Sequence, residues 1–202
     1  MVAVSAEIDT ALKEQSAASE LIWAPELHRI EGKWYVYFAA AHTKKLRDNM
    51  FQHRMYVLEC PDADPLQGVW TEKGQIVTQF DTFSLDATTF RHQGKRWYLW
   101  AQKDPEIKGN TNLYLAELAN PWTLKGEPVM LSKPEFDWEC RGFKVNEGPA
   151  VLVHGDKLFI SYSASATDEN YCMGLLWIDR EADPLQPENW HKAPQPVFRT
   201  SY

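Results

Sequence analysis

The sequence is poor in features that mark several large classes of protein. It has three cysteines, Cys60, Cys140 and Cys172, without Cys-x-x-Cys spacing, which predicts neither a disulfide framework nor a zinc site. It has no apolar run of about 18 residues, which excludes a membrane-spanning helix. The N-terminus has no basic and apolar leader pattern. Together with the unpaired cysteines, this predicts a cytoplasmic protein.

Positive charge is also scarce. The chain has 21 Lys and Arg against 28 Asp and Glu, a net charge of −7. Nucleic acids and anionic membranes are bound by basic surfaces, so we expect neither as a partner. There is no Gly-x-Ser-x-Gly elbow, no P-loop and no Gly-x-Gly-x-x-Gly. No histidine pair has metal-ligand spacing, so we also expect no metal and no cofactor.

What the sequence does contain is a repeat of 62 residues. Lys33, Lys95 and Lys157 each follow a glycine-containing turn that lies between two strand-like runs. This pattern predicts a β-hairpin in each unit. A third strand-like run and then a proline turn with a tryptophan complete the unit. The third runs are Arg54–Cys60, Asn112–Leu118 and Cys172–Asp179.

Four predicted strands per unit, repeated in tandem, are typical of β-propeller blades. We therefore expect an all-β fold with three four-stranded blades over residues 21–202, preceded by a weakly helical or disordered segment, residues 1–20. A β-sandwich is the structural alternative, but it does not explain the period. Propellers close with about four to eight blades. We therefore expect either a piece of a longer protein or a homo-oligomer that completes the ring.

Two carboxylates stand out ahead of the predicted innermost strands. In repeat register Asp86 is equivalent to Gly148, so Asp86 and Glu147 lie one position apart on adjacent blades. Both are surrounded by small or apolar residues, and burial there would raise their pKa values. Two carboxylates at one channel suit acid–base chemistry. A turn-capping role for Asp86 and a solvated Glu147 are the alternatives.

The aromatic and histidine content is harder to interpret. Aromatic rings stack on sugars, but they also fill blade interfaces, and we expect most of them to be core. His92 and His154 occupy equivalent places beside turns, which favours a structural role. His53 has no equivalent in the repeat and is a candidate for a binding loop.

Three segments resemble the family-43 glycoside hydrolases: Trp23-Ala24-Pro25-Glu26, Ser84-Leu85-Asp86-Ala87-Thr88 and Asn146-Glu147-Gly148-Pro149. The resemblance runs from Leu21 to Tyr202 and points to the α-L-arabinofuranosidase branch. It implies part of a five-bladed β-propeller that hydrolyses α-L-arabinofuranosyl or β-xylosyl linkages of plant polysaccharides with inversion. The implied partner is an arabinose- or xylose-containing oligosaccharide.

The resemblance also implies roles for particular residues. Glu147 would be the general acid, and Asp86 would tune the pKa of that acid and its orientation. The candidate substrate-binding residues are Trp23, Glu26, His53 and Asn146.

The general base has no match. In the family it is an Asp of the first blade that typically precedes a proline. Asp9 is the sole Asp ahead of Trp23, and it has neither a following proline nor a strand context. We therefore expect a truncated enzyme that is inactive or weak by itself. A catalytically inactive carbohydrate-binding or assembly fragment is the alternative.

Overall fold

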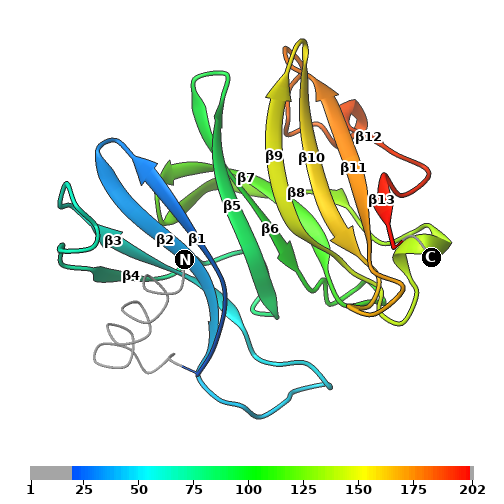
Figure 1. Ribbon diagram of the computed structural model, residues 1–202, viewed down its shortest axis with the longest axis horizontal. Coiled ribbons are helices and arrows are strands. Elements are labelled where there is room, and N and C mark those ends of the chain that lie inside the picture. Colours follow the sequence, from blue (N-terminus) through cyan, green and yellow to red (C-terminus); the bar gives the residue numbers. More distant parts are fainter. Residues whose placement is uncertain (1–19, 201–202) are drawn as a thin grey trace.

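The computed structural model describes residues 20–200, whose regular structure consists of strands and two short 3-10 helices (Figure 1). Within this range no helix is long and apolar enough to cross a membrane. The N-terminal segment predicted as weakly helical or disordered lies outside the described residues, except for Glu20.

The strands form three antiparallel sheets, each built from consecutive strands of the chain. The first sheet contains β1 (Glu20–Ile30), β2 (Lys33–Ala41), β3 (Arg54–Cys60) and β4 (Thr71–Gln75). The second contains β5 (Ser84–His92), β6 (Lys95–Gln102), β7 (Asn112–Asn120) and β8 (Thr123–Ser132). The third contains β9 (Asn146–His154), β10 (Lys157–Ala164), β11 (Cys172–Asp179), β12 (His191–Lys192) and β13 (Phe198–Arg199). The 3-10 helices are η1 (Asp137–Glu139) and η2 (Pro187–Asn189).

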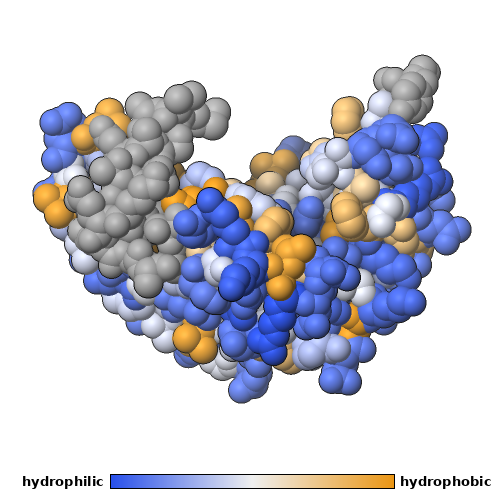
Figure 2. Space-filling view, turned by 90° about the horizontal axis from the view of Figure 1, so that it is seen from below, coloured by the Kyte–Doolittle hydropathy of each residue, from blue (hydrophilic) through white to orange (hydrophobic). Residues whose placement is uncertain are grey.

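Each sheet is one blade, with its first strand innermost. Strand β5 packs between β1 and β9, so the three innermost strands lie side by side (Figure 1). Viewed from below, the described part of the molecule forms an open crescent (Figure 2). These observations confirm the predicted all-β fold of a partial propeller. The third blade differs in one respect, because β12 and β13 are two residues each and both pair with β11.

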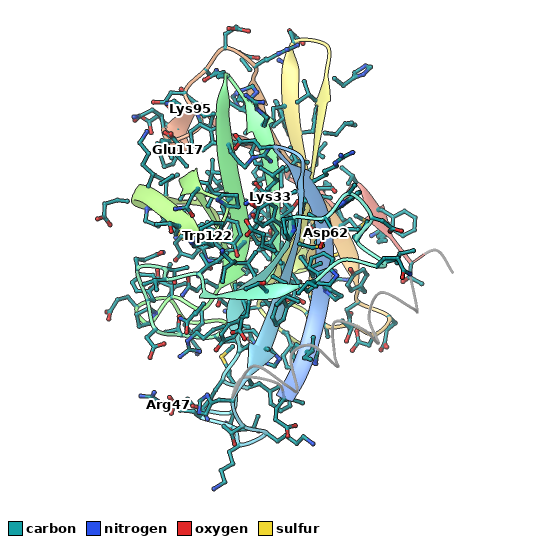
Figure 3. The ribbon with its side chains drawn as sticks, turned by 90° about the vertical axis from the view of Figure 1, so that its left-hand side faces the viewer. Lys33, Arg47, Asp62, Lys95, Glu117 and Trp122 are labelled. Carbon is teal, nitrogen blue, oxygen red and sulfur yellow. The ribbon has the colours of Figure 1, made fainter. Side chains whose placement is uncertain are left out.

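The repeated lysines have a structural explanation. Each begins the second strand of its blade and lies close to a carboxylate of the third strand. The nitrogen–oxygen distances are 3.3 Å for Lys33–Glu59, 3.7 Å for Lys95–Glu117 and 2.6 Å for Lys157–Asp179. Figure 3 shows Lys95 close to Glu117. The lysine of each pair is at least one-third exposed, and ion pairs at the surface contribute about 0–1 kcal/mol each, so the repeat reflects blade geometry more than stability.

Most of the large aromatic side chains belong to one core that spans all three blades. Trp97, Tyr98 and Trp100 of β6 are fully buried, as expected from the sequence. Tyr37 of β2 packs against Tyr98, and its hydroxyl donates to the carbonyl of Pro121 at 2.7 Å. The aromatic residues therefore hold neighbouring blades together.

Candidate active site

Each innermost strand contains a β-bulge at the same place in the repeat. In β1, β5 and β9, two residues face one residue of the next strand. The first residues of the three bulges, Ala24, Asp86 and Gly148, have φ values of 46°, 54° and 58°. A bulge bends the strand and redirects its side chains. A left-handed conformation costs a residue other than glycine on the order of 1–3 kcal/mol, and such strain clusters at functional sites.

Asp86 lies within β5 rather than ahead of it, and its side chain points toward the third blade. Its carboxylate accepts a hydrogen bond from the backbone N–H of Gly148 at 3.0 Å. Burial raises the pKa of Asp86 to about 6, although the Gly148 hydrogen bond acts against this and the nearby charge of Glu26 adds to it. Asp86 is therefore a carboxyl group that titrates near neutral pH.

Glu147 is the second residue of β9. Its pKa is raised to about 7, mainly by burial and secondly by the neighbouring charge of Asp86. The Thr111 hydroxyl, 3.4 Å from the Glu147 carboxylate, acts in the opposite direction. Such a carboxyl group can hold a proton near neutral pH and donate it, which a general acid requires.

Asp86 and Glu147 line the same cavity, which has a volume of about 370 Å³. Glu26 of β1 also lines it, so one carboxylate from each blade reaches this space. The full lining is Ala24, Pro25, Glu26, Asp86, Ala87, Glu147, Gly148, Pro149, Ser163, Thr167 and Tyr171.

Glu26 has two polar neighbours beside the cavity. Its Oε1 atom accepts a hydrogen bond from the Thr88 hydroxyl at 2.7 Å and lies 2.9 Å from His28 Nε2. Thr88 belongs to β5, so Glu26 links the first blade to the second.

The sequence interpretation missed Ser163, Thr167, Tyr171 and Thr111. Ser163 of β10 pairs with Glu147 across the strands, and its hydroxyl donates to the Glu147 carbonyl at 3.0 Å. Ser163 could have been found from the sequence, because counting residues on both sides of the predicted turn at Gly155 places it opposite the segment that contains Glu147. The sequence carries no such signal for Thr167 and Tyr171, which lie in the connection after β10, or for Thr111.

Three predicted substrate-binding residues do not line the cavity. The ring of Trp23 stacks on His53 with centroids 4.0 Å apart, and His53 is fully buried with Nε2 2.7 Å from the Leu21 carbonyl oxygen. Asn146 is also fully buried, and its side chain bonds to protein atoms. His53 and Asn146 are thus buried against protein atoms and Trp23 lies against His53, so these three residues are outside the lining of this cavity.

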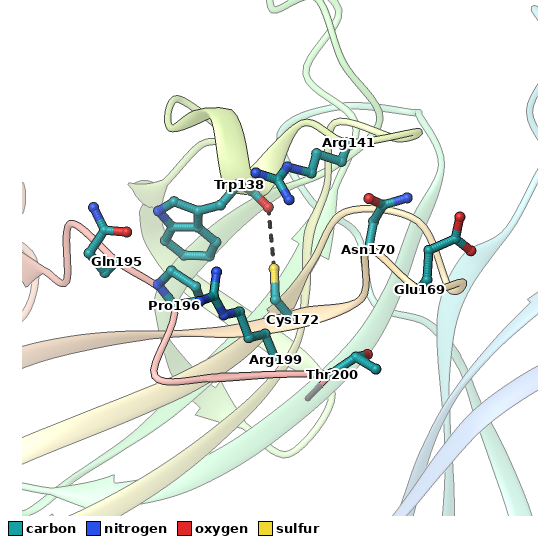
Figure 4. A pocket seen from close by; sticks show the side chains of 9 residues that line it. All are labelled: Trp138, Arg141, Glu169, Asn170, Cys172, Gln195, Pro196, Arg199 and Thr200. Carbon is teal, nitrogen blue, oxygen red and sulfur yellow. Dashed lines mark hydrogen bonds between the residues drawn. The ribbon is translucent and has the colours of Figure 1, made fainter. Parts of the chain in front are cut away.

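A larger cavity of about 610 Å³ lies in the third blade, between η1 and the C-terminal part (Figure 4). Trp138 and Cys172 line it, and the Cys172 thiol lies 3.2 Å from the Trp138 carbonyl oxygen. Its only acidic lining residue is Glu169, so it lacks the paired carboxylates of the smaller cavity. Among residues 20–200, no three His, Cys, Asp or Glu side chains converge as a metal site would require.

Comparison with known proteins agrees with this geometry. Residues 3–202 match the family described as "Glycosyl hydrolases family 43". The chain belongs to glycosyl hydrolase family 43. It is 54% identical to the "Extracellular exo-alpha-(1->5)-L-arabinofuranosidase" of Streptomyces chartreusis, over 88% of this chain and 53% of that protein. The protein of the same name from Streptomyces avermitilis is 56% identical, over 89% of this chain and 37% of that protein.

A solved structure extends the comparison to the fold. The crystal structure of an α-L-arabinofuranosidase from Lactobacillus brevis is 61% identical with a TM-score of 0.88, over 90% of this chain and 57% of that one. The chain thus spans about half the length, or less, of the relatives it matches.

The comparison corrects the expected location. A cytoplasmic protein was predicted, but both Streptomyces relatives are named extracellular. The expectation relied partly on three unpaired cysteines. Cys60 and Cys172 are buried in the structure, where packing rather than the redox compartment accounts for them.

Proposed function

We propose that this chain provides the sugar-binding and proton-donating part of an inverting α-L-arabinofuranosidase. Glu147 is the general acid, and Asp86 raises the pKa of Glu147 and helps to orient it. The observation that carries the proposal is the placement of both carboxyl groups in one cavity with pKa values of about 6 and 7. A free Glu titrates near about 4.3 and would be ionised at neutral pH.

The proposed substrate is an arabinose-containing oligosaccharide with a terminal α-L-arabinofuranosyl unit. Relatives named arabinofuranosidases at 54% and 56% identity support arabinose over xylose. The cavity volume of about 370 Å³ falls within the usual range of small-molecule sites, about 300–1,000 Å³. Glu26 is proposed to contact the sugar, because it lines the same cavity.

Inversion requires a second carboxylate about 6.5–9.5 Å from the acid, to activate water on the opposite face of the sugar. We assign that role to no residue of this chain.

We propose that residues 21–202 act as one domain, which the single core across the three blades supports.

The test is binding and turnover of an α-1,5-linked arabinotriose by the full chain and by Glu147→Gln. Calorimetry should show binding to both proteins. Because no general base is assigned in this chain, chromatography should show at most weak arabinose release by the full chain and none by Glu147→Gln. The product should appear first as the β-anomer in proton NMR. Glu59→Gln, a change of a buried glutamate in the first blade, is the control and should behave like the parent chain.

Three results would decide against parts of the proposal. Absence of binding contradicts the substrate class. Arabinose release that persists in Glu147→Gln removes Glu147 from the mechanism. Binding without release by the parent chain, even with azide added as an external nucleophile in place of the base, selects the alternative of a carbohydrate-binding fragment.

A further inference from the structure

The residue that precedes Glu147 is held by a buried polar cluster that the proposed chemistry does not use. We call it the Glu139 cluster. Its members come from η1 and from four strands of the second and third blades: Ser132, Glu139, Asn146, Tyr162 and Lys192.

Glu139 is the centre of the cluster, and its side chain is fully buried. Its carboxylate accepts hydrogen bonds from the Tyr162 hydroxyl and the Asn146 amide, both at 2.9 Å. The Lys192 ammonium lies 2.8 Å and 2.9 Å from its two oxygens. Backbone N–H groups of Glu135 and Phe136 donate at 2.9 Å and 3.0 Å. A buried charge with this many partners is strongly fixed in place.

The cluster fixes Asn146 at the start of β9. The Asn146 amide donates to Glu139 and to the Val145 carbonyl, and its side-chain oxygen accepts from Ser132 at 2.6 Å. Its backbone N–H donates to the Thr111 carbonyl at 3.0 Å. Side chains alternate along a strand, so Asn146 points into the cluster while Glu147 points into the cavity.

We propose that the Glu139 cluster positions Glu147 for proton transfer. It holds the first residues of β9 in place, so that the Glu147 carboxyl group stays buried beside Asp86. This inference rests on the proposed role of Glu147 as the acid. Asn146, Glu139 and Tyr162 are positioning residues, because they act on Glu147 through the backbone and do not line its cavity.

A similar cluster in the first blade provides a matched control. Glu59 accepts from the Tyr35 hydroxyl at 2.6 Å and pairs with Lys33 and Lys73, both at 3.3 Å. It is likewise a buried glutamate bonded to a tyrosine and to lysine, but none of its members is adjacent in sequence to a residue that lines the cavity, as Asn146 is to Glu147. Tyr162→Phe and Tyr35→Phe therefore remove the same hydrogen bond from two buried glutamates, without a change of charge.

The test measures the pKa of the Glu147 side chain by carbon-13 NMR titration of the full chain and of Asn146→Ala, Tyr162→Phe and Tyr35→Phe. Loosening the start of β9 lets the Glu147 carboxyl group reach water and move from Asp86. The pKa of Glu147 should fall by roughly one unit or more in Asn146→Ala and by less in Tyr162→Phe. Tyr35→Phe should leave it unchanged.

An unchanged Glu147 pKa in a folded Asn146→Ala protein overturns the inference, and so does an equal fall in Tyr35→Phe. If Asn146→Ala does not fold, the comparison of the two tyrosine variants decides alone. No sugar is present in the titration. A failure to bind arabinotriose would therefore overturn the proposed function and leave this result intact.

Discussion

The carboxylate of Asp86 accepts a hydrogen bond from the backbone N–H of Gly148, 62 residues further along the chain. The carboxylate of Glu26 accepts a hydrogen bond from the side-chain hydroxyl of Thr88, which is also 62 residues further along the chain. Each bond joins the innermost strand of one blade to the equivalent position of the next. The repeat therefore brings a carboxylate of one blade to the innermost strand of its neighbour, and in the second and third blades this places Asp86 beside Glu147.

Replacement of Asp86 by asparagine should lower the pKa of Glu147. The charge of Asp86 raises this pKa, and the asparagine oxygen can still accept the Gly148 hydrogen bond. If the chain releases arabinose, the fall in activity at high pH should shift to lower pH, because the acid loses its proton earlier. Carbon-13 titration of Glu147 checks the first effect, with Asp179→Asn as the control. An unaltered Glu147 pKa would show that the two groups are not coupled.

Folding stability should decrease as pH rises from about 4 to about 8. The folded pKa values of Asp86 and Glu147, about 6 and 7, lie above those of the unfolded chain, so the folded state binds more protons in this range. One pKa unit corresponds to about 1.4 kcal/mol, so the two groups together destabilise the ionised protein by several kcal/mol at most.

Urea unfolding at about pH 5 and pH 8 measures this effect. Glu147→Gln should reduce the difference between the two conditions by on the order of 2 kcal/mol, since the neutral amide has no ionised form to bury. Other titratable groups, such as His53 and His92, contribute equally to the unfolding free energies of the parent and the variant, so the comparison between the two proteins cancels their contribution. Equal differences in both proteins would contradict the raised pKa of Glu147.

The sequence was sufficient to predict the strands and to identify the two central carboxylates. The predicted runs Arg54–Cys60 and Cys172–Asp179 coincide with β3 and β11, because strand alternation and turns are local features. The bulges were not predicted. A left-handed residue is usually recognised by glycine, and Asp86 and Ala24 occupy that conformation without it. Only the pairing of neighbouring strands fixes these two residues there.

Contacts between residues of different blades could not be predicted from the sequence either, because they too depend on how distant strands pair. Thr111 reaches Glu147 because its segment forms a parallel bridge with Val145 of the next blade. Asn146 was predicted as a substrate-binding residue within the Asn-Glu-Gly-Pro segment that carries the family resemblance. Its direction into the Glu139 cluster depends on residues up to Lys192, which no local pattern connects to it.

Gly148→Ala should disturb the cavity more than Gly155→Ala, the same change in the turn between β9 and β10. An added Cβ at Gly148 would lie 3.0 Å from the Ser163 hydroxyl oxygen, whereas at Gly155 nothing lies within 4 Å. Both residues have similar positive φ values, 58° and 60°, so the backbone strain of about 1–2 kcal/mol is common to both variants.

Urea unfolding and arabinotriose binding separate these effects. Gly155→Ala should lose only the shared strain energy and keep its affinity. Gly148→Ala should lose more stability and should bind the sugar more weakly, because Ser163 and Gly148 both line the cavity. Equal losses in the two variants would show that the space at Gly148 is not restricted.

Self-association is the remaining prediction, and it concerns one face of the third blade. Leu152 is 64% exposed, and it lies opposite Phe159, which in turn lies opposite Trp177, so the three side chains form a row on one face of the sheet. Contiguous apolar surface of this kind usually marks an interaction site. We expect a second copy of the chain to cover it, so sedimentation equilibrium should show dimers or larger species at high micromolar concentration. Leu152→Asp should shift this equilibrium toward monomer, whereas Val69→Asp, at a 71% exposed position of the first blade, should not. A parent chain that stays monomeric at that concentration would rule out the association.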